Sequence, residues 1–318
     1  MAVSTSVQTE RSTAPTPKFL GVLRGELYKI TRHRTTWLML MVPFAILVLF
    51  WFGLVFLSNQ KTHIEADPLR SVFQNATGTL SLLRVFSGFV LTILTARLIG
   101  LDYQQGTIRI ILARGVKRLQ LLTAKLLAMT IIAFIVLIVG IALDFVLCFI
   151  SYRVVTGSTD VFNVLTSQIW KDLWLYILTI VISMEVTMLL TTAVTVLGRS
   201  VAMGVGVGLS FFAADNIAVG IMFIVHRVIQ NDFWLNITGY FLGPNLNVMP
   251  TTWIGTVATR IVTTPDGQHF VDPLQAVSLG TTPLVDYDTT HILVLTLVYA
   301  IIFAVIAFGL TGRRDVLE

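Results

Sequence analysis

Six long apolar runs constrain the fold of this chain more than any other feature of its sequence. An α-helix rises 1.5 Å per residue, so about 20 apolar residues cross the roughly 30 Å hydrocarbon core of a bilayer. Hydrophobic residues make up 55% of the 318 positions and charged residues only 12%, far below the roughly one quarter typical of soluble domains. The sequence therefore predicts an all-α integral membrane protein with six transmembrane helices. The spans are expected near residues 36–58, 79–100, 123–150, 172–197, 201–225 and 290–311.

The 34 residues before the first span divide into two segments. Residues 1–17 are rich in Ser, Thr and Pro and are expected to be a disordered tail. In residues 18–34 apolar and basic residues alternate, which is typical of an amphipathic helix lying in the membrane interface. A solvated helix leading into the first span fits these residues equally well.

The distribution of lysine and arginine predicts the orientation of the chain. With the N-terminus inside, the inner segments carry fourteen of these residues and the outer side seven, while Arg97 lies near the inner end of its span. The positive-inside rule then places both termini in the cytoplasm and the chain in a plasma membrane (in bacteria, the inner membrane). The net charge of +5 does not indicate nucleic-acid binding, because the basic residues follow the membrane rather than one face.

The stretch from Leu101 to Lys125 is a short basic segment between the second and third spans. Asp102 is a plausible helix N-cap, with Gln105 three residues later in a loose capping box. Gly115 is a natural stop for the helix that follows. Basic residues gather at the end of this helix, where they suit its dipole: Arg114, Lys117 and Arg118. The pattern predicts a compact amphipathic helix, which is either an interfacial connection or a docking surface for a cytoplasmic partner.

The order of residues in this stretch resembles the first cytoplasmic loop of ABC-2 type transporter permeases. The matching positions are Asp102, the aromatic Tyr103, Gly106, Thr107, Arg114, Arg118, Ala124 and Lys125. Asp102 stands where glutamate is usual, and Gly115 where proline is common, but neither changes the charge or the break in the chain. The similarity in spacing and order of spans extends from Arg24 to Arg314.

In that family this loop is a coupling helix that rests on an ATPase subunit. The resemblance implies an ATPase-coupling role for seven residues: Asp102, Gly106, Thr107, Arg114, Lys117, Arg118 and Lys125. It implies a permease domain over residues 35–318, an elbow helix at 18–34 on the cytoplasmic leaflet and a re-entrant helix within the extracellular loop 226–289. It further implies two ATPase copies and a second permease chain, identical or different. ATP would be bound by the ATPase, so no cofactor is expected in this chain.

Four charged residues fall within the predicted spans: Arg84, Asp144, Glu185 and Asp215. Charge at membrane depth is costly, so such groups normally face a partner or a wet cavity. Arg84 lies in the outer half and is expected to pair with Asp144 or Asp215, leaving Glu185 to a polar neighbour such as Thr187 or Thr191, or to protonation. The four residues are interpreted either as interhelical contacts that fix packing or as the polar lining of a translocation path.

No motif for ATP binding, metal binding or nucleophilic catalysis is present in the sequence. The single cysteine, Cys148, is expected to be a small core residue. Enzymatic activity of this chain alone is therefore not expected. The resemblance implies a transport subunit that exports a substrate with energy from a separate ATPase. Two alternatives remain at this point. One is a proton-coupled secondary transporter using the buried carboxylates, and the other is a membrane sensor or immunity protein that binds a peptide.

Overall fold

The computed structural model describes residues 17–57, 68–157, 162, 167–253 and 281–313. Within these ranges the chain is almost entirely helical and contains no strand. The first five helices are α1 (Phe19–Arg32), α2 (Arg34–Leu57), α4 (Pro68–Gln104), α5 (Thr107–Ala113) and α6 (Arg118–Thr156). They are followed by α7 (Ser167–Gly198), α8 (Val201–Ile229), α9 (Phe233–Asn236), the 3₁₀ helix η2 (Ile237–Tyr240), α10 (Leu242–Trp253) and α12 (Thr289–Arg313).

Six of the described helices are long and apolar enough to cross a membrane: α2, α4, α6, α7, α8 and α12. The predicted all-α membrane fold with six spans is therefore confirmed. Helix α4 begins at Pro68, well before the predicted start at 79. Polar side chains in this added stretch are hydrogen-bonded within the protein. Thr77 donates to the carbonyl of Phe73 at 2.8 Å, and Asn75 Nδ2 donates to the hydroxyl of Tyr152 on α6 at 2.9 Å.

The segment before the first span forms the predicted helix, α1, which His33 separates from α2. Its buried residues Leu23, Glu26 and Ile30 lie on one face, so α1 packs against the spans along a narrow stripe. Residues 1–16, on which the predicted disordered tail falls, lie outside the described residues. In the predicted outer loop the described residues form α9, η2 and α10, whereas residues 254–280 also lie outside the description. The re-entrant geometry stays a prediction.

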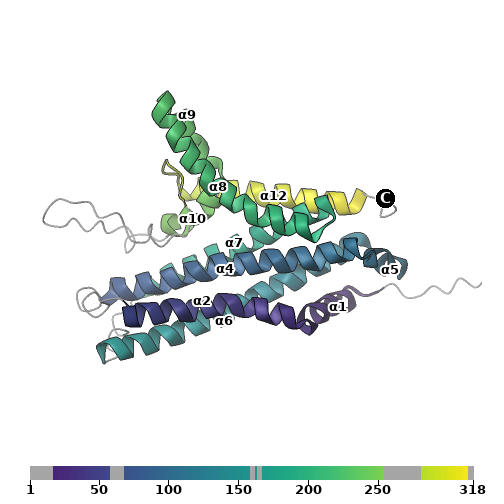
Figure 1. Cartoon of the computed structure of the whole chain (residues 1–318), viewed down its shortest axis with the longest axis horizontal. Helices are drawn as coiled ribbons and strands as arrows, with labels where there is room; N and C mark the ends of the chain where they lie inside the picture. The colour runs from purple at the N-terminus through teal and green to yellow at the C-terminus, as the bar shows by residue number, and fades with distance from the viewer. Residues whose placement is uncertain (1–16, 58–67, 158–161, 163–166, 254–280, 314–318) are drawn as a thin grey trace, which may run out of the picture.

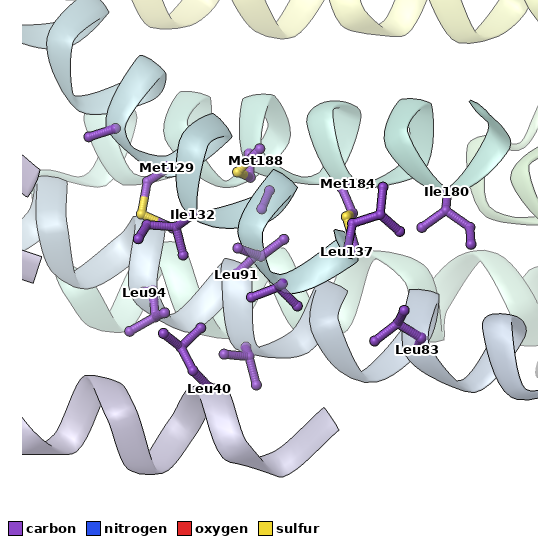
Figure 2. Packing of buried hydrophobic residues seen from close by; sticks show 14 of the residues in the cluster. Leu40, Leu83, Leu91, Leu94, Met129, Ile132, Leu137, Ile180, Met184 and Met188 are labelled. Carbon is purple, nitrogen blue, oxygen red and sulfur yellow. The ribbon is translucent and has the colours of Figure 1, made fainter. Parts of the chain in front are cut away.

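Helix α4 lies between α2 and α6 on one side and α8 and α12 on the other (Figure 1). One hydrophobic core joins it to α1, α2, α6 and α7. Figure 2 shows this core in section, with Leu91 of α4 near Met129 of α6 and Met188 of α7. A second core joins α7, α10 and α12 and includes Ile99 of α4 and Leu122 of α6. Helices α1 and α5 and the C-terminal end of α12 lie at one end of the molecule (Figure 1).

Two glycines of α8 allow close helix packing. A Cβ atom at Gly204 would collide with Thr195 and with Ala96, and one at Gly208 would lie 2.9 Å from Thr92. Both glycines are buried, so this Gly-x-x-x-Gly pair packs α8 against α4 and α7 of the same chain. Gly206 lies on another face and has no atom within 4 Å of its Cβ position. Small residues let backbones approach where no hydrophobic effect drives helices together in lipid.

Candidate functional site

A network of four charged side chains lies at the end of the molecule that carries α5. Lys125 Nζ of α6 lies 2.9 Å from Glu26 Oε2 of α1 and 2.5 Å from Asp102 Oδ2 of α4. It also donates to the carbonyl oxygen of Leu98 at 2.7 Å. Glu26, Asp102 and Lys125 are 4%, 5% and 3% exposed. Three helices from distant parts of the sequence are thus joined through one buried ammonium group.

Lys29 of α1 completes this network on its more exposed side. Its Nζ lies 3.3 Å from both Glu26 Oε1 and Asp102 Oδ2, and its side chain is 38% exposed. Burial by itself lowers the pKa of Lys29, but the two carboxylates outweigh that effect and hold the pKa above its ordinary value of 10.5. Two lysines therefore balance two carboxylates, which is the condition under which charged groups are tolerated in a low-dielectric interior.

Asp102 also fixes the position of α5. The hydroxyl of Thr107 donates to Asp102 Oδ1 at 2.9 Å. Gly106 makes the turn between α4 and α5 with φ +66°, a left-handed conformation that glycine adopts without strain. The predicted N-cap role of Asp102 was wrong, because α4 stays helical through Gln104 and Gly106 occupies the N-cap position of α5. The carboxylate reaches α5 from the end of the preceding span instead.

Helix α5 itself lies at the surface, and none of its residues is buried. Ile110 is 57% exposed, and the side chains of Arg109, Arg114 and Lys117 around it are exposed as well. Gly115, with φ +85°, follows the helix as the predicted stop. An apolar side chain surrounded by cations is typical of a surface that receives an acidic, partly apolar partner.

The seven residues predicted to couple to an ATPase divide into two groups. The first group consists of two members of the network and the threonine that binds one of them: Asp102, Lys125 and Thr107. The second group lies around α5, in its turns or at the start of α6: Gly106, Arg114, Lys117 and Arg118. Only the second group includes exposed cations, whereas Asp102 and Lys125 of the first group are buried. The network holds α5 in place, and the second group contributes to the surface.

Sequence reasoning missed the two members of the network that α1 supplies. Glu26 was not singled out, and Lys29 was counted only as one of the basic residues near the membrane. The available signal was the position of Glu26, a carboxylate on the same face as Leu23 and Ile30 within an otherwise basic helix. A buried charge on an apolar face requires a partner, and that partner is Lys125, 99 residues further along the chain.

Two of the charged residues in the spans bind α10. Arg84 of α4 donates to the carbonyl oxygen of Leu246 at 2.5 Å and to Asn247 Oδ1 at 2.8 Å. Asp215 Oδ2 of α8 accepts from the backbone N–H of Gly243 at 2.8 Å, in the first turn of α10. The predicted pairing of Arg84 with Asp144 or Asp215 was therefore wrong. Arg84 and Asp215 instead bind successive turns of the same short helix.

The other two carboxylates in the spans also have neutral partners. Asp144 of α6 is 6% exposed and accepts from Trp51 Nε1 of α2 at 2.9 Å. Glu185 of α7 accepts from the hydroxyl of Thr130 on α6 at 3.0 Å. Its partner is thus a polar neighbour, as predicted, but it lies on another helix and is not one of the two threonines suggested. Cys148 is buried beside Trp51, as predicted. The hydrogen bonds of Asp144 and Glu185 join neighbouring spans.

The family comparison covers the part of the chain that builds the network and most of the spans. A family model described as "ABC-2 family transporter protein" matches residues 22–215, more than half of the sequence. The matched range contains α5, all four charged members of the network and the four charged residues in the spans. No curated protein matches the sequence significantly. The chain is thus a multi-pass membrane protein that belongs to the ABC-2 type transporter permease family.

Proposed function

We propose that this chain is the membrane-spanning subunit of an exporter whose energy comes from ATP hydrolysed by a separate ATPase subunit. Membership of the permease family supports a transport role. The exposed basic surface of α5, which lies at the same end as α1 and the end of α12 (Figure 1), supports docking of a second protein there. Two ATPase copies and a second permease chain complete the proposed assembly. The substrate passes from the cytoplasm to the outside.

The observation that carries this proposal is the connection of α5 to the spans. Thr107, the first residue of α5, donates a hydrogen bond to Asp102. Asp102 in turn forms ion pairs with Lys125 of α6 and Lys29 of α1. A displacement of α5 by a partner is therefore transmitted to two spans and to the elbow helix α1. A flexible loop without such contacts would absorb the same displacement. A conformational change needs contacts that differ between two states, and α5 is where an ATPase can supply them.

Charge favours the cytoplasmic assignment of this end. The exposed side chains of Arg109, Arg114 and Lys117 agree with the excess of basic residues that cytoplasmic segments carry. The same cations suit a partner with an acidic groove and raise its rate of association. In this arrangement α1 lies in the inner leaflet and braces α5 through Lys29 and Asp102. The spans supply the path, and the ATPase supplies the energy.

The proposal is tested by affinity purification of the full chain from its native host in mild detergent, followed by mass spectrometry. The wild-type chain is expected to bring a nucleotide-binding subunit in stoichiometric amount. The double variant Arg114→Glu, Lys117→Glu is expected to lose it. The matched control is Arg153→Glu, Lys171→Glu, which makes the same charge change at exposed positions near the opposite ends of α6 and α7. A wild-type chain that purifies without any nucleotide-binding protein in several detergents contradicts the proposal.

A further inference from the structure

Arg84 is a buried cation without an acidic partner among the described residues. It is 5% exposed, and its bonds go to the carbonyl of Leu246 and the amide of Asn247, both uncharged. A guanidinium group carries five N–H donors, of which these bonds use two. The guanidinium group makes no further hydrogen bond to the described residues, although the uncharged side chain of Tyr176 also lies close enough to interact with it. A charge placed in a membrane span normally faces a counter-ion or a wet cavity.

Such a cavity lies beside Arg84. Its volume is about 160 Å³, and it is lined by residues of α4, α7, α8 and α10. Its polar lining comes from Arg84, Thr92, Ser183, Thr187, Asn216 and Asn247. None of the lining residues is acidic. The cavity therefore has a positive charge beside the hydroxyl of Ser183, which suits an anionic group rather than a cation. The side-chain amides of Asn216 and Asn247 already donate to backbone carbonyls of the protein.

The rest of the cavity wall is apolar and reaches the outer surface of the helices. Phe89 of α4 lines the cavity and is 43% exposed, and Ala213 of α8 lines it and is exposed as well. Both lie within candidate membrane spans, where an exposed side chain faces lipid or another subunit. A ligand entering between α4 and α8 meets apolar side chains first and the guanidinium afterwards. This order matches a molecule with an acyl or alkyl part and one anionic group.

We propose that the cavity between α4, α7, α8 and α10 binds the carboxylate or phosphate group of an amphiphile through Arg84. Arginine presents paired N–H groups that match the two oxygens of either anion. The hydroxyl of Ser183 lines the same cavity as a further donor to the anion, whereas the Thr187 hydroxyl already donates to the carbonyl oxygen of Ser183 at 2.7 Å. That this amphiphile is a transported substrate rests on the proposed function, whereas its binding to the cavity does not.

Binding is tested by the thermal unfolding of the purified full chain in a neutral detergent. The probes share one chain length: decanoate and decyl phosphate as anions, decanol as the neutral control and decyltrimethylammonium as the cationic control. Acetate and inorganic phosphate test the anion without its chain. At about 100 times the Kd, either anionic amphiphile is expected to raise Tm by about 5 °C, with smaller shifts from the other four compounds.

Two variants test separately whether binding depends on the charge of Arg84 and on the free volume of the cavity. Arg84→Gln removes the charge and is expected to abolish the anion-specific shift. Because Arg84 also binds α10, Arg84→Gln removes structural contacts as well as the charge, so a second variant is needed. Ser183→Leu fills the cavity without changing the hydrogen bonds of Arg84. The matched control is Ser210→Leu, the same change at an exposed position of α8, which is expected to retain the full shift.

Three results would overturn the proposal. The first is an equal shift from decanol and decanoate, which would indicate unspecific binding of the chain. The second is a full anion-specific shift in Ser183→Leu, which would place the site elsewhere. The third is an equal shift from acetate or inorganic phosphate, which would exclude the amphiphile. Since the chain is measured without an ATPase, these outcomes are independent of the co-purification that tests the proposed function.

Discussion

Lys125 and Asp102 form a buried ion pair of 2.5 Å that joins the third span to the end of the second. The pair does more than connect two neighbouring helices, because Lys125 also binds Glu26 of α1 and Asp102 also binds Thr107 of α5. Each of these contacts crosses from one helix to another. The stability and the motion of this end of the molecule therefore depend on a few named atoms.

Removal of Lys125 is expected to destabilise the chain strongly. Lys125→Met leaves Glu26 and Asp102 buried with only Lys29 nearby, and breaking a buried pair in this way costs about 3–5 kcal/mol. The control is Lys29→Met, which removes the same charge from a side chain that is 38% exposed and 3.3 Å from the same carboxylates. Thermal unfolding in detergent measures both. Equal stability of the two variants would contradict the structural role assigned to Lys125.

Loss of the Thr107 hydroxyl is expected to loosen α5 without unfolding the spans. Thr107→Val removes the 2.9 Å bond to Asp102, and a hydrogen bond to a charged group contributes about 1.5–3 kcal/mol. Amide hydrogen exchange in α5 should therefore accelerate by about tenfold or more, since about 1.4 kcal/mol corresponds to a factor of ten. Thr107→Ser retains the hydroxyl and should exchange like the wild type. Unchanged exchange in the valine variant would show that other contacts hold α5.

Two glycines on different faces of α8 are expected to change the stability of the chain differently when each is replaced by alanine. Gly204→Ala places a methyl group against Thr195 and Ala96 and should lower the unfolding temperature, because α8 must move away from its neighbours. Gly206→Ala meets no atom within 4 Å and should leave the unfolding temperature unchanged or raise it slightly, since alanine favours helix by about 1 kcal/mol over glycine. A destabilised Gly206→Ala chain, with Gly204→Ala unaffected, would mean that α8 packs with its opposite face.

The carboxylate of Asp215 is expected to stabilise α10. Asp215→Ala removes the acceptor for the N–H of Gly243, and the loss of a capping carboxylate costs about 0.5–2 kcal/mol. Hydrogen exchange of the first turn of α10 should become faster. Asp232→Ala serves as the control, because Asp232 is 84% exposed and makes no capping bond. Equal exchange rates in both variants would show that Asp215 does not stabilise the first turn of α10.

The sequence predicted the spans and α5 because these depend on local composition. Apolar runs identify helices in lipid whatever their neighbours are, and the Gly106 and Gly115 positions delimit α5 through backbone conformation alone. The partners of charged residues were predicted less well. A pairing depends on the rotation of each helix about its axis and on elements whose position the sequence does not reveal. Arg84 and Asp215 both bind α10, a helix that was expected but could not be placed.

The network was half predicted for the same reason. Asp102, Thr107 and Lys125 lie within 24 residues of one another and matched a family loop, so they were found together. Glu26 lies on a helix almost a hundred residues away from Lys125, and no local pattern connects the two. The resemblance also assigned these residues to contact with a partner, whereas Asp102 and Lys125 are 5% and 3% exposed. Their burial indicates that they position α5 rather than touch its partner.

The most direct test of the central claim is a cross-link from the surface of α5 in native membranes. A photoreactive amino acid replaces Ile110, which is 57% exposed, or Val228 near the far end of α8, which is 78% exposed. The account predicts that position 110 cross-links to a nucleotide-binding subunit and that position 228 does not. Cross-linking of that subunit at 228 but not at 110 would contradict the docking of an ATPase on α5.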